Sequence, residues 1–140
     1  MNYQEVIDNI YQEVKPLFGK GKVADYIPAL ANVNPQQYGI AIATLDGQLI
    51  GTGDYQTKFS IQSISKVFTL AMVVRHMGGE LWKYVGREPS GTPFNSLIQL
   101  EHEHGIPRNP FINAGALVVT DKLMNLYHRP KEAILQFVRS

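Results

Sequence analysis

The segment that most constrains this chain is the apolar run "VFTLAMVV" at residues 67–74, which follows the polar pair Ser63 and Lys66. The run is far too short to span a bilayer, which takes about 20 apolar residues. A helix that is apolar nearly all round has to be buried. We therefore expect a central helix that begins near Ser63, lies between a sheet and other elements, and ends at Gly78-Gly79, where glycine commonly forms a left-handed C-cap.

Hydrophobic periodicity predicts the elements around this helix. Apolar residues at helical spacing, from Val6 to Phe18, predict an amphipathic first helix whose last turn is kinked or ended by Pro16. Two apolar runs around Asp46-Gly47 predict a β-hairpin. The remaining expectations are a hairpin span of 38–54, a short strand at 59–61, a loop at 86–95, and helices at 114–127 and from 131 onward. Helices packed against an antiparallel sheet predict an α+β, multi-layered fold.

The composition excludes several classes of function. With 140 residues the chain is the size of one domain, and we expect residues 1–140 to form a single one. Its 13 basic and 12 acidic side chains give no reason to expect a nucleic-acid or membrane partner. The absence of cysteine excludes disulfides and thiolate catalysis. The first residues, "MNYQEVIDNIYQEV", carry acids and do not resemble a signal peptide, so a cytoplasmic location is expected.

Two motifs could suggest a metal or phosphate site. The stretch "EHEH" at 101–104 has two histidines with flanking glutamates, but no third ligand cluster accompanies it. A solvated segment of mixed charge is the better interpretation. The glycines of "GKGK" and "GTGD" complete no Walker pattern ahead of a helix and are better explained as turns. We therefore expect no metal ion.

Ser63 and Lys66 have the spacing of a nucleophile and its base. Side chains three residues apart on a helix lie on the same face, about one turn from each other. A serine hydroxyl becomes a good nucleophile when a neighbouring base takes its proton. An amine can do so only in its uncharged form, which apolar surroundings favour. The alternative is structural, because serine is also a common N-cap residue and the bare Ser-x-x-Lys spacing is weak evidence.

Five stretches of the chain resemble the serine-dependent bacterial glutaminases in order and spacing. They are "KVADYIPALA" (22–31), "TLDGQLIGTGD" (44–54), "FSIQSISK" (59–66), "VGREPSGTPFN" (85–95) and "RNPFINAGALVV" (108–119). The resemblance implies a β-lactamase and penicillin-binding-protein fold, hydrolysis of L-glutamine to L-glutamate and ammonia through a seryl acyl-enzyme, and no cofactor. A homo-oligomer is also expected.

The resemblance also implies roles for single residues. Ser63 would be the nucleophile and Lys66 its base, while Tyr26 would relay a proton or bind substrate. Gln62 and Asn113 match substrate-binding positions, and Ser63 itself would contact the substrate. Hydroxyl, amide and phenol groups suit a substrate with a neutral side-chain amide. From the residues alone, Tyr26 is a half-buried core aromatic and Asn113 is the N-cap of the helix that follows it.

The resemblance covers only the N-terminal half of such a catalytic domain. Further site residues of the family lie beyond residue 140, so we expect the fold to be incomplete in this chain. The final helix, "EAILQFVRS", stops with its apolar pattern still in progress. Two alternatives therefore stay beside the enzyme: a truncated, inactive glutaminase fragment, and a penicillin-recognising serine acylase. The second is disfavoured because "NPFINAGA" matches the glutaminases.

Overall fold

The computed structural model describes residues 1–91, 93, 100–101 and 103–140. The chain divides into two compact units, Met1–Phe59 and Ser60–Ser140. Each unit is described by itself below. The expectation of a single domain over residues 1–140 stays a prediction.

The first unit begins with α1 (Tyr3–Val14), as the periodicity predicted. Asn2 caps the helix, because its side chain accepts a hydrogen bond from the backbone N–H of Glu5 at 3.3 Å. Pro16 follows in the 3₁₀ helix η1 (Lys15–Leu17), so the α-helix ends where proline was expected to end it. Ile7 is the buried residue of α1, with 2% of its surface exposed.

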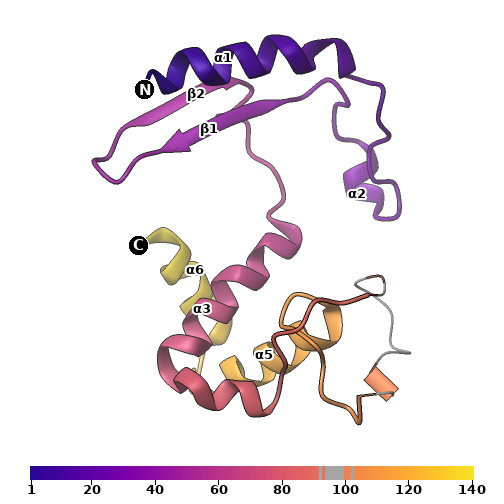
Figure 1. Cartoon of the computed structure of the whole chain (residues 1–140), viewed down its shortest axis with the longest axis vertical. Coiled ribbons are helices and arrows are strands. Elements are labelled where there is room, and N and C mark those ends of the chain that lie inside the picture. The colour runs from indigo at the N-terminus through magenta and orange to yellow at the C-terminus, as the bar shows by residue number, and fades with distance from the viewer. Residues whose placement is uncertain (92, 94–99, 102) are drawn as a thin grey trace. The chain divides into compact units, whose positions relative to one another are not determined.

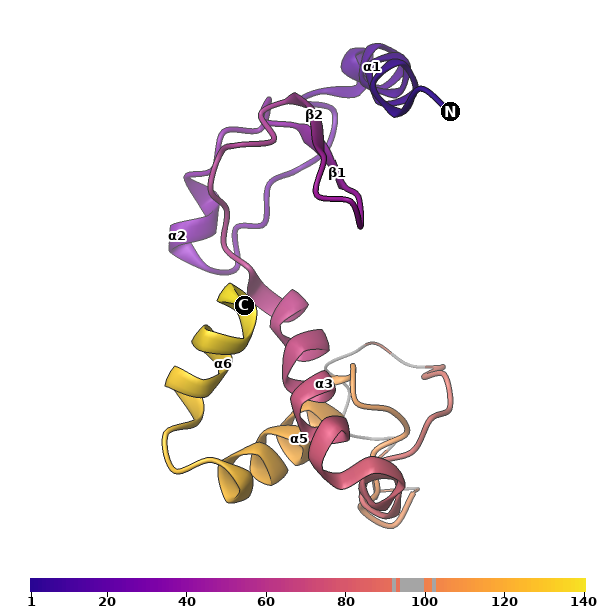
Figure 2. The ribbon, with the colours of Figure 1, turned by 90° about the vertical axis from the view of Figure 1, so that its left-hand side faces the viewer.

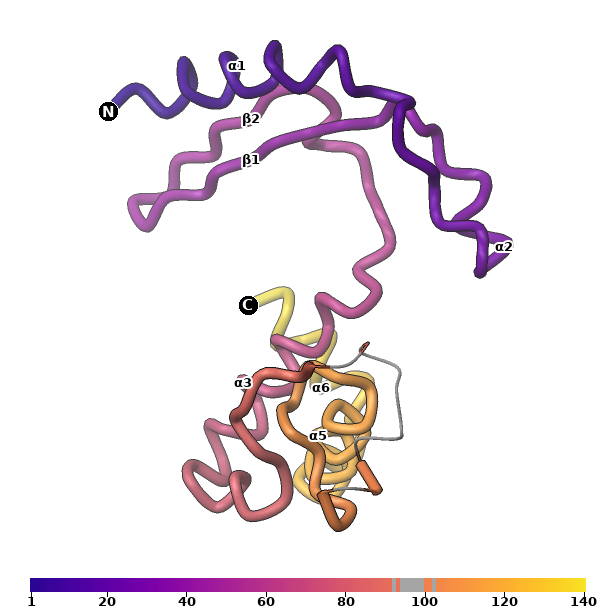
Figure 3. Tube along the Cα trace, turned by 45° about the vertical axis from the view of Figure 1, so that its right-hand side comes forward, coloured from indigo at the N-terminus to yellow at the C-terminus, as the bar shows by residue number. Residues whose placement is uncertain are grey.

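A two-stranded antiparallel sheet lies under α1 in Figures 1 and 3. Strands β1 (Gly39–Ala43) and β2 (Leu49–Gly53) pair in a register that sets Ile42 opposite Ile50. The predicted hairpin is confirmed, and Gly47 adopts the positive φ, 88°, that its turn requires. The rings of Tyr11, Phe18 and Tyr38 pack together, with centroids 5.1–5.9 Å apart, and tie the end of α1 to the sheet. The short helix α2 (Pro28–Ala31) completes the regular elements of this unit.

The second unit is helical within the described residues. The 3₁₀ helix η2 (Gln62–Ile64) leads into α3 (Ser65–Met77), which is followed by the 3₁₀ helix η3 (Gly78–Lys83). Helices α5 (Asn113–Leu126) and α6 (Pro130–Arg139) pack against α3, as Figure 2 shows. The core of this unit consists of Met72, Val73, Leu81, Val85, Val119 and Leu123. The helices expected at 114–127 and after Pro130 are confirmed.

Two expectations were wrong in detail. Residues 59–61 form no strand, and Ile61 already has the right-handed helical dihedrals that lead into η2. Within its own unit, helix α3 packs on α5 and α6 and Val67 remains 53% exposed, while the expected position of α3 beside a sheet stays a prediction. Gly78 has a positive φ of 53° but a ψ of −130°, which leads the chain into η3 rather than into a left-handed cap. The predicted loop 86–95 is irregular at 86–91 and 93, and its other residues lie outside the described ones.

The α+β class is confirmed, since helices accompany an antiparallel pair of strands. Across the residues that the structure describes, none of the helices combines the length and the apolar character needed to cross a membrane.

Candidate active site

Ser63 and Lys66 lie one helical turn apart in the second unit. Ser63 belongs to η2, and the two residues between them, Ile64 and Ser65, both have right-handed helical dihedrals. The backbone therefore winds through one turn from Ser63 to Lys66, which puts both side chains on one face. The capping interpretation of Ser63 is wrong, because Ile64 occupies the N-cap position of α3 and no side chain caps that end. Ser63 itself is exposed.

The amine of Lys66 is held by two uncharged oxygens. Its Nζ donates to the backbone carbonyl of Phe111 at 2.9 Å and to Oδ1 of Asn113 at 2.8 Å. These partners follow Lys66 by 45 and 47 residues, so the fold, not local sequence, brings them together. The lysine side chain is half-buried. The structure thus joins two of the residues singled out in the sequence, Lys66 and Asn113.

Asn113 does not cap α5, contrary to the interpretation from the residues alone. It is the first residue of the helix, and the N-cap residue is Ile112, which makes no side-chain capping bond. The carboxamide oxygen instead accepts from Lys66. An amine that can carry a charge is a stronger donor than a backbone N–H, which explains why the side chain turns towards it.

The turn before α5 is shaped by Asn109, a residue that the sequence reasoning missed. Its Oδ1 accepts from the backbone N–H groups of Phe111 and Ile112, at 3.0 and 3.1 Å. Its Nδ2 donates to the carbonyl of Glu88 at 2.9 Å. The signal was present in the sequence, since Asn-Pro dipeptides start turns in which the asparagine side chain bonds to the following backbone.

Close contact between α5 and this turn depends on a glycine. A Cβ atom at Gly115 would lie 1.8 Å from the carbonyl oxygen of Asn109, a distance that no side chain can occupy. Gly115 therefore lets the first turn of α5 pack directly against the backbone of the Asn109 turn. Asn113 lies two residues before Gly115, so this contact fixes the position of Asn113 relative to the turn.

Gln62, which precedes the serine, has a strained backbone. Its φ is 44°, a left-handed value that residues other than glycine adopt infrequently. Its side-chain amide donates to Oγ of Ser60 at 2.8 Å, and the residue is exposed. Such strain is found preferentially at functional sites.

Tyr26 lies in the first unit, in a bend before α2, and its side chain is 76% exposed. The interpretation of Tyr26 as a half-buried core aromatic is therefore wrong. Its expected role beside Ser63 stays a proposal.

The described part of the chain contains no group of three or more histidine, aspartate or glutamate side chains arranged to bind a metal. In the stretch 101–104, His102 lies outside the described residues, and Glu103 forms an ion pair with Arg108. This pairing accords with a segment of mixed charge.

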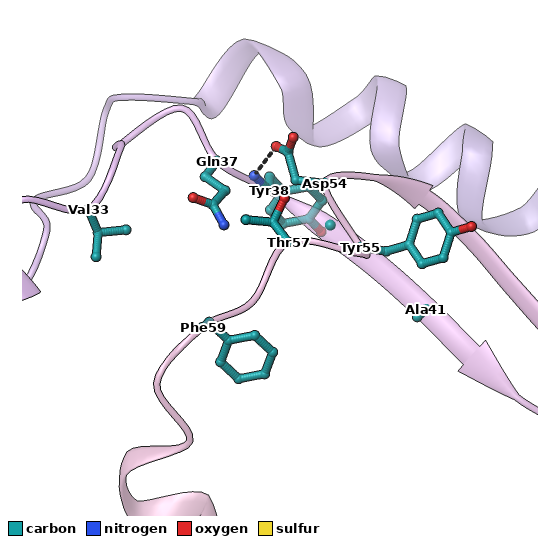
Figure 4. A pocket seen from close by; sticks show the side chains of 9 residues that line it. Val33, Gln37, Tyr38, Ala41, Asp54, Tyr55, Thr57 and Phe59 are labelled. Carbon is teal, nitrogen blue, oxygen red and sulfur yellow. Dashed lines mark hydrogen bonds between the residues drawn. The ribbon is translucent and has the colours of Figure 1, made fainter.

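Several pockets occur among the described residues, and two of them, one in each unit, are compared with the candidate site residues. The first, about 380 Å³, is shown in Figure 4 and is lined by Tyr38, Asp54, Tyr55 and Phe59 among others. Asp54 there accepts a hydrogen bond from the backbone N–H of Tyr38 at 3.0 Å. None of the candidate site residues lines it. The second, about 430 Å³, includes Asn109 and Phe111 in its wall and so adjoins the turn that holds Lys66.

Comparison with known proteins identifies the family. The family profile described as "Glutaminase" matches residues 21–140. The chain belongs to the glutaminase family. A glutaminase of Marinomonas sp. (strain MWYL1) is 58% identical over 136 residues, which cover 97% of this chain and 45% of that protein. Glutaminase 2 of Escherichia coli (strain K12) is 58% identical over 135 residues, covering 96% of this chain and 44% of that protein.

Solved glutaminase structures have the same fold. The structure named as probable glutaminase ybaS superposes with a TM-score of 0.89 at 39% identity, covering 96% of this chain and 44% of that one. A probable glutaminase of Bacillus subtilis superposes with a TM-score of 0.71 at 32% identity, covering 91% of this chain and 41% of that one. The β-lactamase-like α+β class expected from the resemblance is thereby confirmed. This glutaminase chain spans less than half the length of the relatives that it matches.

Proposed function

We propose that the protein to which this chain belongs hydrolyses L-glutamine to L-glutamate and ammonia, with Ser63 as nucleophile and Lys66 as its base. The observation that carries the proposal is the pair of acceptors around Lys66, one turn after Ser63. Family membership supports the overall reaction. One similar solved structure, Mglu, is described in its glutamate form, and glutamate is the product expected here.

The geometry around Lys66 suits a base. An uncharged amine has two N–H bonds and one lone pair in a tetrahedral arrangement. The Phe111 carbonyl and Asn113 Oδ1 each accept a hydrogen bond from the amine, and these two bonds restrain its orientation. Because Ser63 lies on the same face one turn earlier, its hydroxyl proton is the natural target. The amine then returns that proton to the leaving ammonia.

In the first step Ser63 Oγ attacks the side-chain amide carbon of glutamine and Lys66 accepts the hydroxyl proton. The C–N bond breaks, the nitrogen leaves as ammonia with that proton, and a glutamyl ester of Ser63 remains. Water then attacks the ester carbon while Lys66 accepts its proton. The bond between the acyl carbon and Ser63 Oγ breaks, Lys66 returns the proton to Oγ, and glutamate is released. Neither step requires a cofactor or a metal.

Substrate binding is assigned to Gln62, Asn113 and Tyr26, with Ser63 also in contact with the substrate. Amide and phenol groups can hold a zwitterionic amino acid by hydrogen bonds. Asn113 combines two tasks in this proposal, because the oxygen of its amide holds Lys66 and its NH₂ group is a donor for substrate. We also propose a cytoplasmic, homo-oligomeric protein that binds neither nucleic acid nor membrane.

The alternative is that this chain is a truncated and inactive glutaminase fragment. It is favoured by the length comparison, because the chain spans about 45% of the relatives. The two proposals are compatible if the complete protein is the enzyme and these 140 residues form one part of it.

Trapping of the acyl-enzyme tests the role of Ser63. The complete protein is treated with a glutamine-like diazo-ketone, and the adduct is located by peptide mass. An adduct on Ser63 is expected, together with loss of ammonia release in Ser63→Ala. Ser65→Ala is the matched control, because the Ser65 hydroxyl donates to the Gln62 carbonyl at 2.8 Å and should not react. An adduct on another residue, with Ser63 unmodified, would overturn the assignment.

A further inference from the structure

The carbonyl that binds Lys66 belongs to a turn rather than to a regular element. Phe111 lies between the buried Pro110 and the first residue of α5, Asn113. Regular backbone hydrogen bonds therefore do not fix the orientation of its carbonyl. Hydrogen bonds to the side chain of Asn109 hold this part of the backbone instead.

One peptide group connects Asn109 to Lys66. The carbonyl of Phe111 and the N–H of Ile112 belong to the same planar, trans peptide unit and point in opposite directions. Asn109 Oδ1 accepts from the N–H end at 3.1 Å, and Lys66 Nζ donates to the carbonyl end at 2.9 Å. Rotation of this plane would break both bonds together.

The other side of the Asn109 amide is also held. Its Nδ2 donates to the Glu88 carbonyl at 2.9 Å, while the N–H of Glu88 donates to the Arg108 carbonyl at 2.9 Å. A carboxylate lacks the donor, and a hydroxyl, which can both donate and accept, has one oxygen where the amide has separate acceptor and donor atoms. The single side chain of Asn109 therefore forms hydrogen bonds with the backbone of two segments, 86–88 and 108–112.

We propose that Asn109 is a positioning residue for Lys66: it fixes the Phe111–Ile112 peptide plane and so directs the lysine amine towards Ser63. The proposal rests on the proposed function, in which Lys66 is the base. It differs from the role of Asn113, which contacts the amine directly. Asn109 acts through the backbone and touches neither the substrate nor the reacting atoms.

The expected consequence is a change in catalysis that exceeds the change in stability. A base displaced by about 1 Å can cost on the order of 100-fold in rate. Asn109→Ala removes both the acceptor and the donor, and we expect kcat to fall roughly 10- to 100-fold while KM changes less than about threefold. Asn109→Ser keeps a hydroxyl that can accept from the following backbone N–H groups, so it should recover part of that loss.

The experiment uses the complete protein with Asn109→Ala, Asn109→Ser and the matched control Asn34→Ala. Asn34 is also followed by a proline, and its Oδ1 accepts from the N–H of Gln36 at 3.0 Å, so it loses the same kind of bond in the other unit. Four quantities are measured: kcat for glutamine, KM for glutamine, the melting temperature, and the rate at which an amine-acylating reagent labels Lys66. The proposal expects faster labelling of Lys66 in Asn109→Ala, an intermediate rate in Asn109→Ser, and no change in Asn34→Ala.

The outcomes separate this proposal from the proposed function. If the unsubstituted protein releases no ammonia but Asn109→Ala still changes the labelling of Lys66, the function fails and the positioning of the lysine stands. If kcat and labelling in Asn109→Ala match those of Asn34→Ala, the positioning role is wrong. A lower melting temperature with unchanged labelling would mean a purely structural role and would also overturn it. Should Asn109→Ala fail to fold, Asn109→Ser decides by the same comparison.

Discussion

At Lys66, two of the groups that hold the amine are uncharged: the Phe111 carbonyl and the carboxamide of Asn113. A carboxylate in either place would pair with an ammonium and oppose release of its proton. Uncharged oxygens can accept hydrogen bonds from the amine in either of its protonation states. These two acceptors are compatible with the proposed role of Lys66 as the base.

Lys66→Arg should be nearly as inactive as Lys66→Ala. Arginine can donate to the same two oxygens, but it does not give up its proton in proteins and cannot act as the base. We expect a loss of at least about 100-fold in kcat for both variants, measured as ammonia release by the complete protein. Turnover close to that of the unsubstituted protein in Lys66→Arg would contradict the base role.

The turn of the hairpin carries a titratable group with a shifted pKa. The hydroxyl of Thr44 donates a hydrogen bond to the Asp46 carboxylate, and this bond lowers the pKa of Asp46 below its usual value. A carboxyl whose pKa is lowered on folding stabilises the fold above the unfolded pKa. That contribution is lost as pH falls through the lowered pKa of the folded state.

Thr44→Ala should raise the pKa of Asp46 towards its usual value and narrow the acid range over which the turn is stabilised. The pKa is followed by a carboxyl-carbon NMR titration, with Thr57→Ala as a control substitution that leaves the Asp46 hydrogen bond intact. An Asp46 pKa that is the same in Thr44→Ala and in the unsubstituted protein would show that another group causes the shift.

The sequence predicted the roles of neighbouring residues better than those of residues far apart in the chain. Ser63 and Lys66 are three residues apart, and local spacing was sufficient to propose their relation. The partners of Lys66 are more than 40 positions away, so Asn113 was proposed only from a family motif and Asn109 was missed. The error at Asn113 has the same origin, because capping rules consider only the local backbone and not a distant amine.

At the scale of elements, α5 and the turn before it form one packed unit. Ala114 and Gly115 in the first turn of the helix are buried, and the backbone of Asn109 contacts this turn where Gly115 has no side chain. A larger residue there must move either the helix or the turn. Because the turn carries the Phe111 carbonyl and the helix carries Asn113, either movement affects the partners of Lys66.

Gly115→Ala should destabilise the protein by about 1–3 kcal/mol, the usual cost of overpacking a close contact. It should also lower kcat. The matched control is Gly79→Ala in η3, because a Cβ atom there meets no heavy atom within 4 Å. In denaturant unfolding, we expect the free energy of unfolding of Gly79→Ala to lie within about 0.5 kcal/mol of that of the unsubstituted protein. Equal stability of the two variants would mean that the contact at Gly115 relaxes without cost.

Elements with a strong periodic pattern were predicted well from the sequence. Helix α1, the hairpin and the two C-terminal helices are all where periodicity, Pro16 and the Asp46-Gly47 turn placed them. The prediction of a short strand at 59–61 was wrong. A strand needs a pairing partner, and the sequence of three residues does not specify one.

At the scale of the whole molecule, apolar side chains remain uncovered near the candidate site. Ile64 and Val67, next to Ser63 and Lys66, are 50% and 53% exposed. Leu117 and Met124, which follow Asn113 along one exposed side of α5, are 70% and 61% exposed. The chain spans about 45% of its relatives, and we propose that further polypeptide of the complete protein covers these side chains.

Purified residues 1–140 should therefore not hydrolyse glutamine. With the neighbouring side chains exposed, Ser63 faces water and Lys66 is only half-buried, and electrostatic stabilisation of a developing oxyanion is weak in a solvated site. Ammonia release is compared for residues 1–140 and the complete protein at equal concentration. Clear turnover by the shorter chain, abolished by Ser63→Ala, would show that these residues suffice for catalysis.

The 47-residue separation between Lys66 and Asn113 has a consequence for the order of events during synthesis. Ribosomes add about 5–20 residues per second, so roughly 2–10 seconds pass between the two codons. During that interval the growing chain already carries Ser63 and Lys66 but lacks both oxygens that orient the amine. In the proposed mechanism, Ser63 is therefore synthesised before its base can be oriented, and the base is oriented only after the segment that carries Phe111 and Asn113 has emerged.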